Sequence, residues 1–172
     1  MRLVQYEPKG GYTDSVKPTV YIETTIPSYL AARPSRDLLV TAFQQMTREW
    51  WDGRRAEFDL FVSQIVLDEA AAGDADAARR RLELLSGVPV LEINEACRKL
   101  AAQLIVGVPI PERAALDALH VAVAAVNKMD YLVTWNCTHI ANATLRGRIE
   151  SICAANGFTA PTICTPQELL GP

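Results

Sequence analysis

Short apolar runs alternate with longer stretches of helical periodicity along most of this chain, and no other feature limits its fold as strongly. Runs such as TVYIE and FDLFVS are almost continuously apolar, which is typical of strands that are buried on both faces of a sheet. Strands of this kind, separated by helices, pair in parallel and are covered by helices on both sides. The sequence therefore predicts an α/β fold, a three-layer α/β/α sandwich around a central, mostly parallel sheet of about five strands.

The bounds of the predicted elements follow from the period of the apolar residues. The predicted strands are residues 19–23, 58–63, 89–93, 130–135 and 161–165. The predicted helices are residues 35–54, 66–73, 76–86, 94–106, 112–127 and 144–156. Residues 1–18 contain two adjacent glycines and two prolines without a periodic apolar pattern. We therefore predict a flexible N-terminal arm over residues 1–18 and one domain over residues 19–172.

Composition and charge exclude several classes of protein. A hydrophobic content of 49% with 22% charged residues excludes a disordered or fibrous chain. The four cysteines are widely spaced, without a C-x-x-C pair, which indicates a reduced compartment rather than a disulfide framework or a zinc site. A net charge of -3 argues against a protein that coats nucleic acid by bulk charge. No apolar run approaches the length of a membrane span and no signal peptide is recognisable, so we expect a cytoplasmic location.

Polar side chains stand where two of the predicted strands end. Glu23 follows TVYI, and Asn136 follows YLVTW. Ligands of parallel α/β sheets bind beyond the carboxyl ends of the strands, and an amide oxygen can ligate a hard cation as a carboxylate does. Taken alone, Asn136 is equally compatible with ordinary turn chemistry.

Two further acids lie on predicted helices that flank these strands. Glu69 lies beside the apolar stripe of its helix, although a surface glutamate at the edge of an amphipathic helix would show the same pattern. Between residues 114 and 126, only Asp117 and His120 are not apolar. A buried carboxylate requires a cation, hydrogen-bond donors or water, although the helix dipole alone could stabilise Asp117. His120, one turn later, is interpreted as a core histidine.

One edge of a parallel sheet can bring together all four polar residues, which are Glu23, Glu69, Asp117 and Asn136. Four unrelated structural roles would not predict that these residues share one place. A cluster of acids without histidine or cysteine at ligand spacing suits Mg²⁺ or Mn²⁺. Such ions activate water and neutralise the charge that develops on a phosphate. The pattern therefore predicts a metal-dependent nuclease.

Four segments, VYIETTIPSYL, VSQIVLDEAAAG, ALDALHVAVAA and YLVTWN, resemble the PIN domain family and, within it, the VapC-type toxins of toxin–antitoxin pairs. The resemblance extends over about residues 19–170. It implies an endoribonuclease that uses one or two Mg²⁺ or Mn²⁺ ions, forms homodimers and is silenced by a small antitoxin protein. By position, the resemblance implies that Glu23, Glu69 and Asp117 are acidic metal ligands and that Asn136 replaces a fourth acid. It also implies that the hydroxyls of Thr24 and Thr134 hold ligands or metal-bound water.

Two positions depart from the pattern of this family, which usually has aspartate at both. Glu23 keeps the negative charge and lengthens the side chain by one methylene. Asn136 removes a negative charge, which should weaken metal binding, especially of a second ion. The alternative function is therefore a catalytically weak or inactive PIN-fold protein that binds RNA or a protein partner.

Cations and one aromatic residue near the strand ends are candidates for contact with RNA. Arg33 and Arg36 follow the first motif, and Trp135 adjoins Asn136, where it could stack on single-stranded RNA. The arginine run 79–81 is interpreted as ordinary solvated helix cations. A third function, a nucleophilic hydrolase built on Cys137 and His139, rests only on the short spacing of these two residues.

Overall fold

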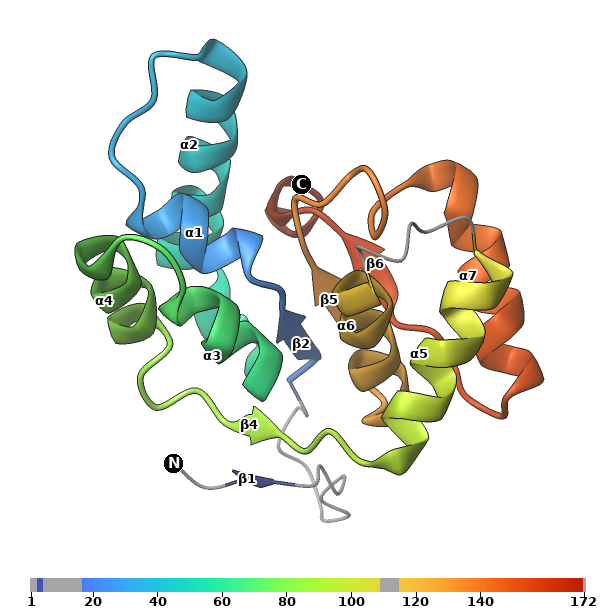
Figure 1. Cartoon of the computed structure of the whole chain (residues 1–172). Helices are drawn as coiled ribbons and strands as arrows, with labels where there is room; N and C mark the ends of the chain where they lie inside the picture. The colour runs from blue at the N-terminus through green and yellow to red at the C-terminus, as the bar shows by residue number, and fades with distance from the viewer. Residues whose placement is uncertain (1–2, 5–16, 109–114, 172) are drawn as a thin grey trace.

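The computed structural model describes residues 3–4, 17–108 and 115–171 (Figure 1). In these ranges, six parallel strands form one sheet with the order β1-β4-β3-β2-β5-β6. The strands are β1 (Leu3–Val4), β2 (Thr19–Ile22), β3 (Asp59–Ser63), β4 (Val90–Leu91), β5 (Tyr131–Val133) and β6 (Thr162–Cys164). Strand β2 pairs with β3 on one side and β5 on the other, and all of its residues are buried.

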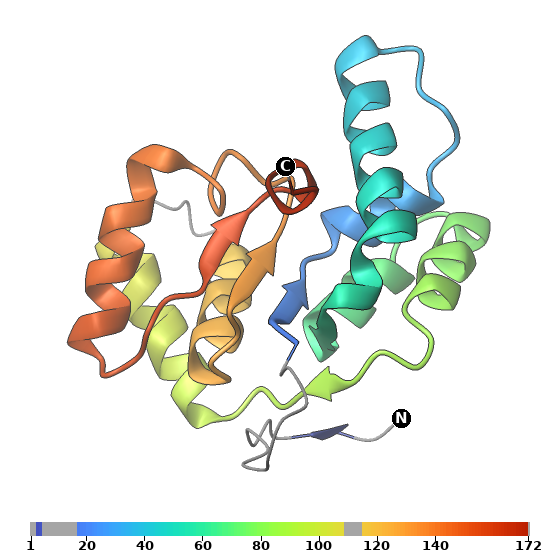
Figure 2. The same cartoon turned by 180° about the vertical axis from the view of Figure 1, so that it is seen from behind.

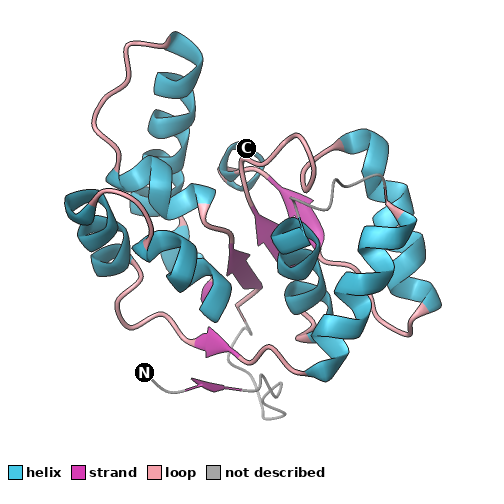
Figure 3. Ribbon diagram, viewed as in Figure 1, coloured by secondary structure: helices cyan, strands magenta, loops and turns pink. Residues whose placement is uncertain are grey.

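Helices connect the strands, as the ribbon in Figure 3 shows. The α-helices are α1 (Thr25–Ala31), α2 (Leu38–Gly53), α3 (Gln64–Ala71), α4 (Ala75–Leu84), α5 (Glu95–Gly107), α6 (Ala115–Val126) and α7 (Ala143–Ala155). The 3₁₀ turns are η1 (Arg55–Glu57) and η3 (Pro166–Leu169). Several helices begin where a side chain accepts hydrogen bonds from the free N–H groups of the first turn. The capping residues are Asp37 for α2, Asp74 for α4, Asn94 for α5 and Asn142 for α7.

The helices form two groups on opposite faces of the sheet, with α1 to α4 on one face and α5 to α7 on the other (Figures 1 and 2). The chain proceeds from β2 through β3 to β4 in one direction and then crosses to β5 and β6 on the other side of β2. Because crossovers between parallel strands are right-handed, this reversal places the two groups of helices on opposite faces. The reversal point lies between β2 and β5, which is where ligands bind in open α/β sheets.

The predicted three-layer α/β/α fold is confirmed, with the predicted strands shortened at their ends. Helix α1, strand β1 and the two 3₁₀ turns lie outside the predicted strand and helix ranges. Strand β1 lies within the predicted arm and pairs with β4. The remainder of the arm, residues 1–2 and 5–16, and the start of the predicted helix 112–127 lie outside the described residues. The domain boundary at residue 19 stays a prediction. No helix in the described ranges has the length and apolar character that crossing a membrane requires.

Candidate functional site

Glu23 lies at the reversal point, directly after β2 and before α1. Its side chain is only 5% exposed, and its Oε2 atom accepts three hydrogen bonds. The donors are the Thr25 backbone N–H at 3.0 Å, the Thr25 hydroxyl at 2.5 Å and the Thr134 hydroxyl at 2.7 Å. Thr134 follows β5, so Glu23 joins the carboxyl ends of the two strands between which the chain reverses. Thr25 also accepts a bond from the Trp135 backbone N–H at 2.8 Å.

Glu69 reaches the same place from α3, which follows β3. Its Oε2 atom accepts a hydrogen bond from the Thr24 hydroxyl and lies 3.1 Å from His120 Nε2. Burial alone would raise the pKa of Glu69, but the hydrogen bonds from His120 and Thr24 outweigh burial, so its pKa lies below the ordinary value. The side chain is 31% exposed, and Glu69 is therefore a charged carboxylate in contact with solvent.

His120 completes this cluster from α6, on the opposite face of the sheet. One ligand atom from each of Glu23, Glu69 and His120 lies within 4.8 Å of the other two. An open pocket of about 360 Å³ lies in front of the two carboxylates and is also lined by Thr24, Thr25, Ser28 and Tyr29. Sequence reasoning interpreted His120 as a core histidine and so did not include it in the site. The available signal was its polar character on an otherwise apolar helix, one turn after Asp117.

Asp117 and Asn136 have other partners in the structure. The Asp117 Oδ2 atom lies 2.7 Å from His139 Nδ1. The Asn136 side-chain oxygen accepts a hydrogen bond from the His139 backbone N–H at 3.1 Å, so the amide stabilises the turn after β5. Among the described residues, the group whose ligand atoms meet within 4.8 Å contains neither of these two. Asp117 nevertheless lies one turn before His120, on the same side of α6.

The residues predicted to contact RNA differ in exposure. Arg33 and Arg36 are exposed in the loop between α1 and α2. The Trp135 ring is only 8% exposed, stacks on Phe43 with ring centroids 4.2 Å apart, and donates its indole N–H to the Thr47 hydroxyl at 2.7 Å. Trp135 therefore packs in the core and offers little ring surface to a base. In the arginine run 79–81, Arg79 pairs with Asp76 and Glu83, and the other two donate to backbone carbonyls.

The structure gives no support to a nucleophilic Cys137. Cys137 is exposed, but partial desolvation of the thiol and the negative charge of Glu168 both raise its pKa, and a protonated thiol is a poor nucleophile. The nearby His139 ring binds Asp117 instead. We expect Cys137→Ser to leave the hydrolytic activity measured for the wild type unchanged, whereas loss of hydrolysis in this variant would restore the hydrolase interpretation.

The fold and the site together define a class: a doubly wound α/β domain with a carboxylate cluster at the point where its topology reverses. The family model of the PIN domain matches residues 37–136, which is more than half of the chain, and the protein belongs to the PIN domain family. The match includes Glu69, Asp117 and Asn136, and begins after Glu23. No curated protein and no solved structure matched the chain. Because PIN domains are generally nucleases, family membership supports a nuclease function.

Proposed function

We propose that this protein is a Mg²⁺- or Mn²⁺-dependent endoribonuclease and the toxin component of a type II toxin–antitoxin pair. The observation that carries the nuclease function is the meeting of Glu23 and Glu69 at the open pocket where the chain reverses. Ligand atoms of the two carboxylates lie within 4.8 Å of each other, and a cation between them would offset their mutual repulsion. Their oxygen atoms are the ligands that Mg²⁺ and Mn²⁺ prefer, so the residues present fit a divalent ion.

Glu23 and Glu69 would hold this ion, and Asp117 is the third carboxylate proposed to approach it. When bound, a divalent ion activates water and neutralises charge on the scissile phosphate. The threonine hydroxyls keep the carboxylates in position, because Thr24 donates to Glu69 and Thr134 donates to Glu23. Fixed ligands lose little conformational freedom when the ion binds. The exposed Arg33 and Arg36 would position the phosphates of the RNA backbone.

The proposed partners follow from the resemblance to VapC-type toxins. An antitoxin would lay a peptide or helix across the acidic pocket, with an arginine that reaches the carboxylates. The protein would act as a homodimer in the cytoplasm. Near the exposed arginines, Leu38 and Leu39 are 87% and 63% exposed at the start of α2, and their apolar surface suits contact with a protein partner.

A second candidate function is a catalytically weak PIN-fold protein that binds RNA or a protein without cutting. The observation that favours it is the amide of Asn136, which is uncharged and already bonded to the backbone of His139. The two candidates differ in whether wild-type protein binds Mn²⁺ in calorimetry and cleaves a mixed single-stranded RNA. Binding with cleavage supports the nuclease, and RNA binding without either supports the second candidate.

Asn136→Asp is expected to tighten Mn²⁺ binding at least about tenfold, because it adds a negative charge next to the acidic pocket. An aspartate oxygen can accept the same bond from the His139 backbone, so the turn after β5 should survive the change. Calorimetric titration with Mn²⁺ measures the affinity, and the thermal unfolding midpoint checks the fold. An unchanged affinity in a folded variant would show that position 136 does not contribute to the metal site.

A further inference from the structure

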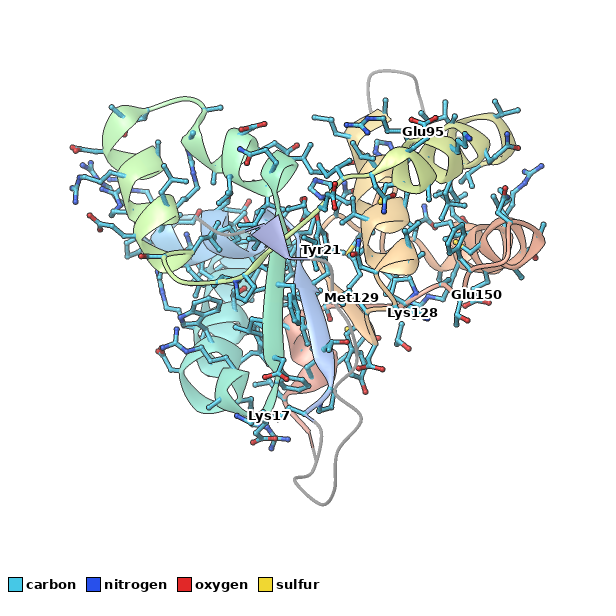
Figure 4. All side chains as sticks on the ribbon, turned by 90° about the horizontal axis from the view of Figure 1, so that it is seen from below. Lys17, Tyr21, Glu95, Lys128, Met129 and Glu150 are labelled. Carbon is cyan, nitrogen blue, oxygen red and sulfur yellow. The ribbon has the colours of Figure 1, made fainter. Side chains whose placement is uncertain are left out.

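A chain of buried polar groups leads from β3 to the acidic pocket. Ser63 Oγ lies 2.6 Å from the Tyr21 hydroxyl, which lies 2.8 Å from His120 Nδ1. The other ring nitrogen, His120 Nε2, lies 3.1 Å from Glu69 Oε2. Tyr21 lies between the two groups of helices, as its label in Figure 4 shows. Tyr21 therefore holds one ring nitrogen of His120 in the protein interior. The other ring nitrogen points at Glu69 in the acidic pocket.

The hydroxyl groups of Tyr21 and Ser63 allow either ring nitrogen of neutral His120 to carry the proton. If Nε2 is protonated, it donates to Glu69, and Nδ1 accepts from the Tyr21 hydroxyl. If Nδ1 is protonated, it donates to Tyr21, whose hydroxyl donates to Ser63 in turn. The Tyr21 hydroxyl can donate and accept at once, so it serves in both arrangements. The two arrangements carry the same number of protons, and the second one leaves a lone pair on Nε2 beside Glu69.

This second arrangement is the one that histidine ligands of metal ions adopt. A metal-bound histidine usually donates its other ring N–H to an oxygen of the protein, which fixes the tautomer and the orientation of the ring. Adjacent ligand atoms around an octahedral ion with bonds of about 2.1 Å lie about 3 Å apart. The distance of 3.1 Å between His120 Nε2 and Glu69 Oε2 already matches this spacing.

We propose that His120 is a nitrogen ligand of the metal ion held by Glu23 and Glu69, and that the site therefore selects Mn²⁺ over Mg²⁺. The inference rests on the proposed metal-dependent function and adds a ligand and a metal preference to it. Carboxylates suit both ions, but Mn²⁺ belongs to the first-row transition metals, which bind mixed nitrogen and oxygen sites, whereas Mg²⁺ is a hard ion that keeps to oxygen ligands. A site of two carboxylates and one imidazole therefore gains more from Mn²⁺ than from Mg²⁺.

The test uses the full chain and the metal ions alone. Calorimetric titrations give the affinities for Mn²⁺ and Mg²⁺, and pulsed electron paramagnetic resonance of bound Mn²⁺ detects coupling to a ligand nitrogen. The variants are His120→Asn, which removes Nε2, and His139→Asn, which changes the other of the two histidines in the chain. The wild-type spectrum requires no variant, so the absence of nitrogen coupling there would overturn the proposal even where a substitution prevents folding.

We expect wild type to bind Mn²⁺ at least about tenfold more tightly than Mg²⁺, with nitrogen coupling that persists in His139→Asn. His120→Asn should lose the coupling and most of the preference for Mn²⁺. Absence of nitrogen coupling in wild type, or its persistence in folded His120→Asn, would overturn the role of His120, while metal binding and RNA cleavage by wild type would still support the nuclease. Failure of wild type to bind either ion would reject both the proposed metal-dependent function and this inference.

Discussion

Glu69→Gln is expected to lower metal-dependent RNA cleavage at least about a hundredfold, because a ligand charge is lost from an ion that supplies several kcal/mol of transition-state stabilisation. Glutamine preserves the length of the side chain, and its amide oxygen can still accept the hydrogen bonds from Thr24 and His120. The fold should therefore survive. Single-turnover cleavage of a labelled RNA at saturating Mn²⁺ measures the loss of rate, and calorimetry measures the accompanying loss of Mn²⁺ affinity.

The matched control for this change is Asp68→Asn, which removes the same charge from the neighbouring residue of α3. Asp68 is exposed and accepts a hydrogen bond from Gln64 at 2.8 Å, one turn earlier on the same helix. Its charge lies outside the pocket, so cleavage and Mn²⁺ affinity should stay close to those of wild type. Equal rates of RNA cleavage by Glu69→Gln and Asp68→Asn would show that Glu69 is not a ligand of the metal ion.

The features of the fold that could be predicted from the sequence are those with a local pattern. Continuous apolar runs gave the strands, and helical periodicity gave the helices between them, because both patterns repeat within a few residues. The ends were less well predicted, as in β4, where only Val90 and Leu91 pair although five residues were expected. Helix α1 has only seven residues and includes Pro27, so it is too short to show a clear period.

The contacts within the site join residues that are distant in the sequence, and local patterns do not predict such pairs. Thr134 was assigned to the site only by the resemblance to the PIN family, and the structure joins it to Glu23 by a hydrogen bond of 2.7 Å. The link from Tyr21 to His120 spans 99 positions and crosses between layers, so it depends on the packing of α6 over the sheet. Polarity also does not identify a partner, which is why the pairing of Asp117 with His139 was not foreseen.

Asp117→Ala is expected to abolish detectable RNA cleavage and to weaken Mn²⁺ binding by about tenfold or more, because it removes a negative charge one helical turn from His120. The bond to His139 uses one carboxylate oxygen, Oδ2, and a carboxylate can bind a second group through its other oxygen. Asp117 can therefore hold His139 and still approach an ion. Calorimetry with Mn²⁺ and the RNA cleavage assay measure the two losses.

The comparison that isolates this role is His139→Ala, which breaks the same pair but keeps the carboxylate of Asp117. If Asp117 contributes its charge to the metal site, His139→Ala should retain Mn²⁺ binding that Asp117→Ala loses. The His139 and Asp117 side chains are only 24% and 18% exposed, so removing either partner leaves the other without its hydrogen bond and should lower the unfolding temperature of both variants. The titrations are therefore made at a temperature at which both variants are folded. Equal losses of metal binding in the two variants would instead show that Asp117 acts only by holding His139 and the turn that follows β5. The charge of the carboxylate, rather than its bond to the imidazole, is thus the property that this pair of variants measures.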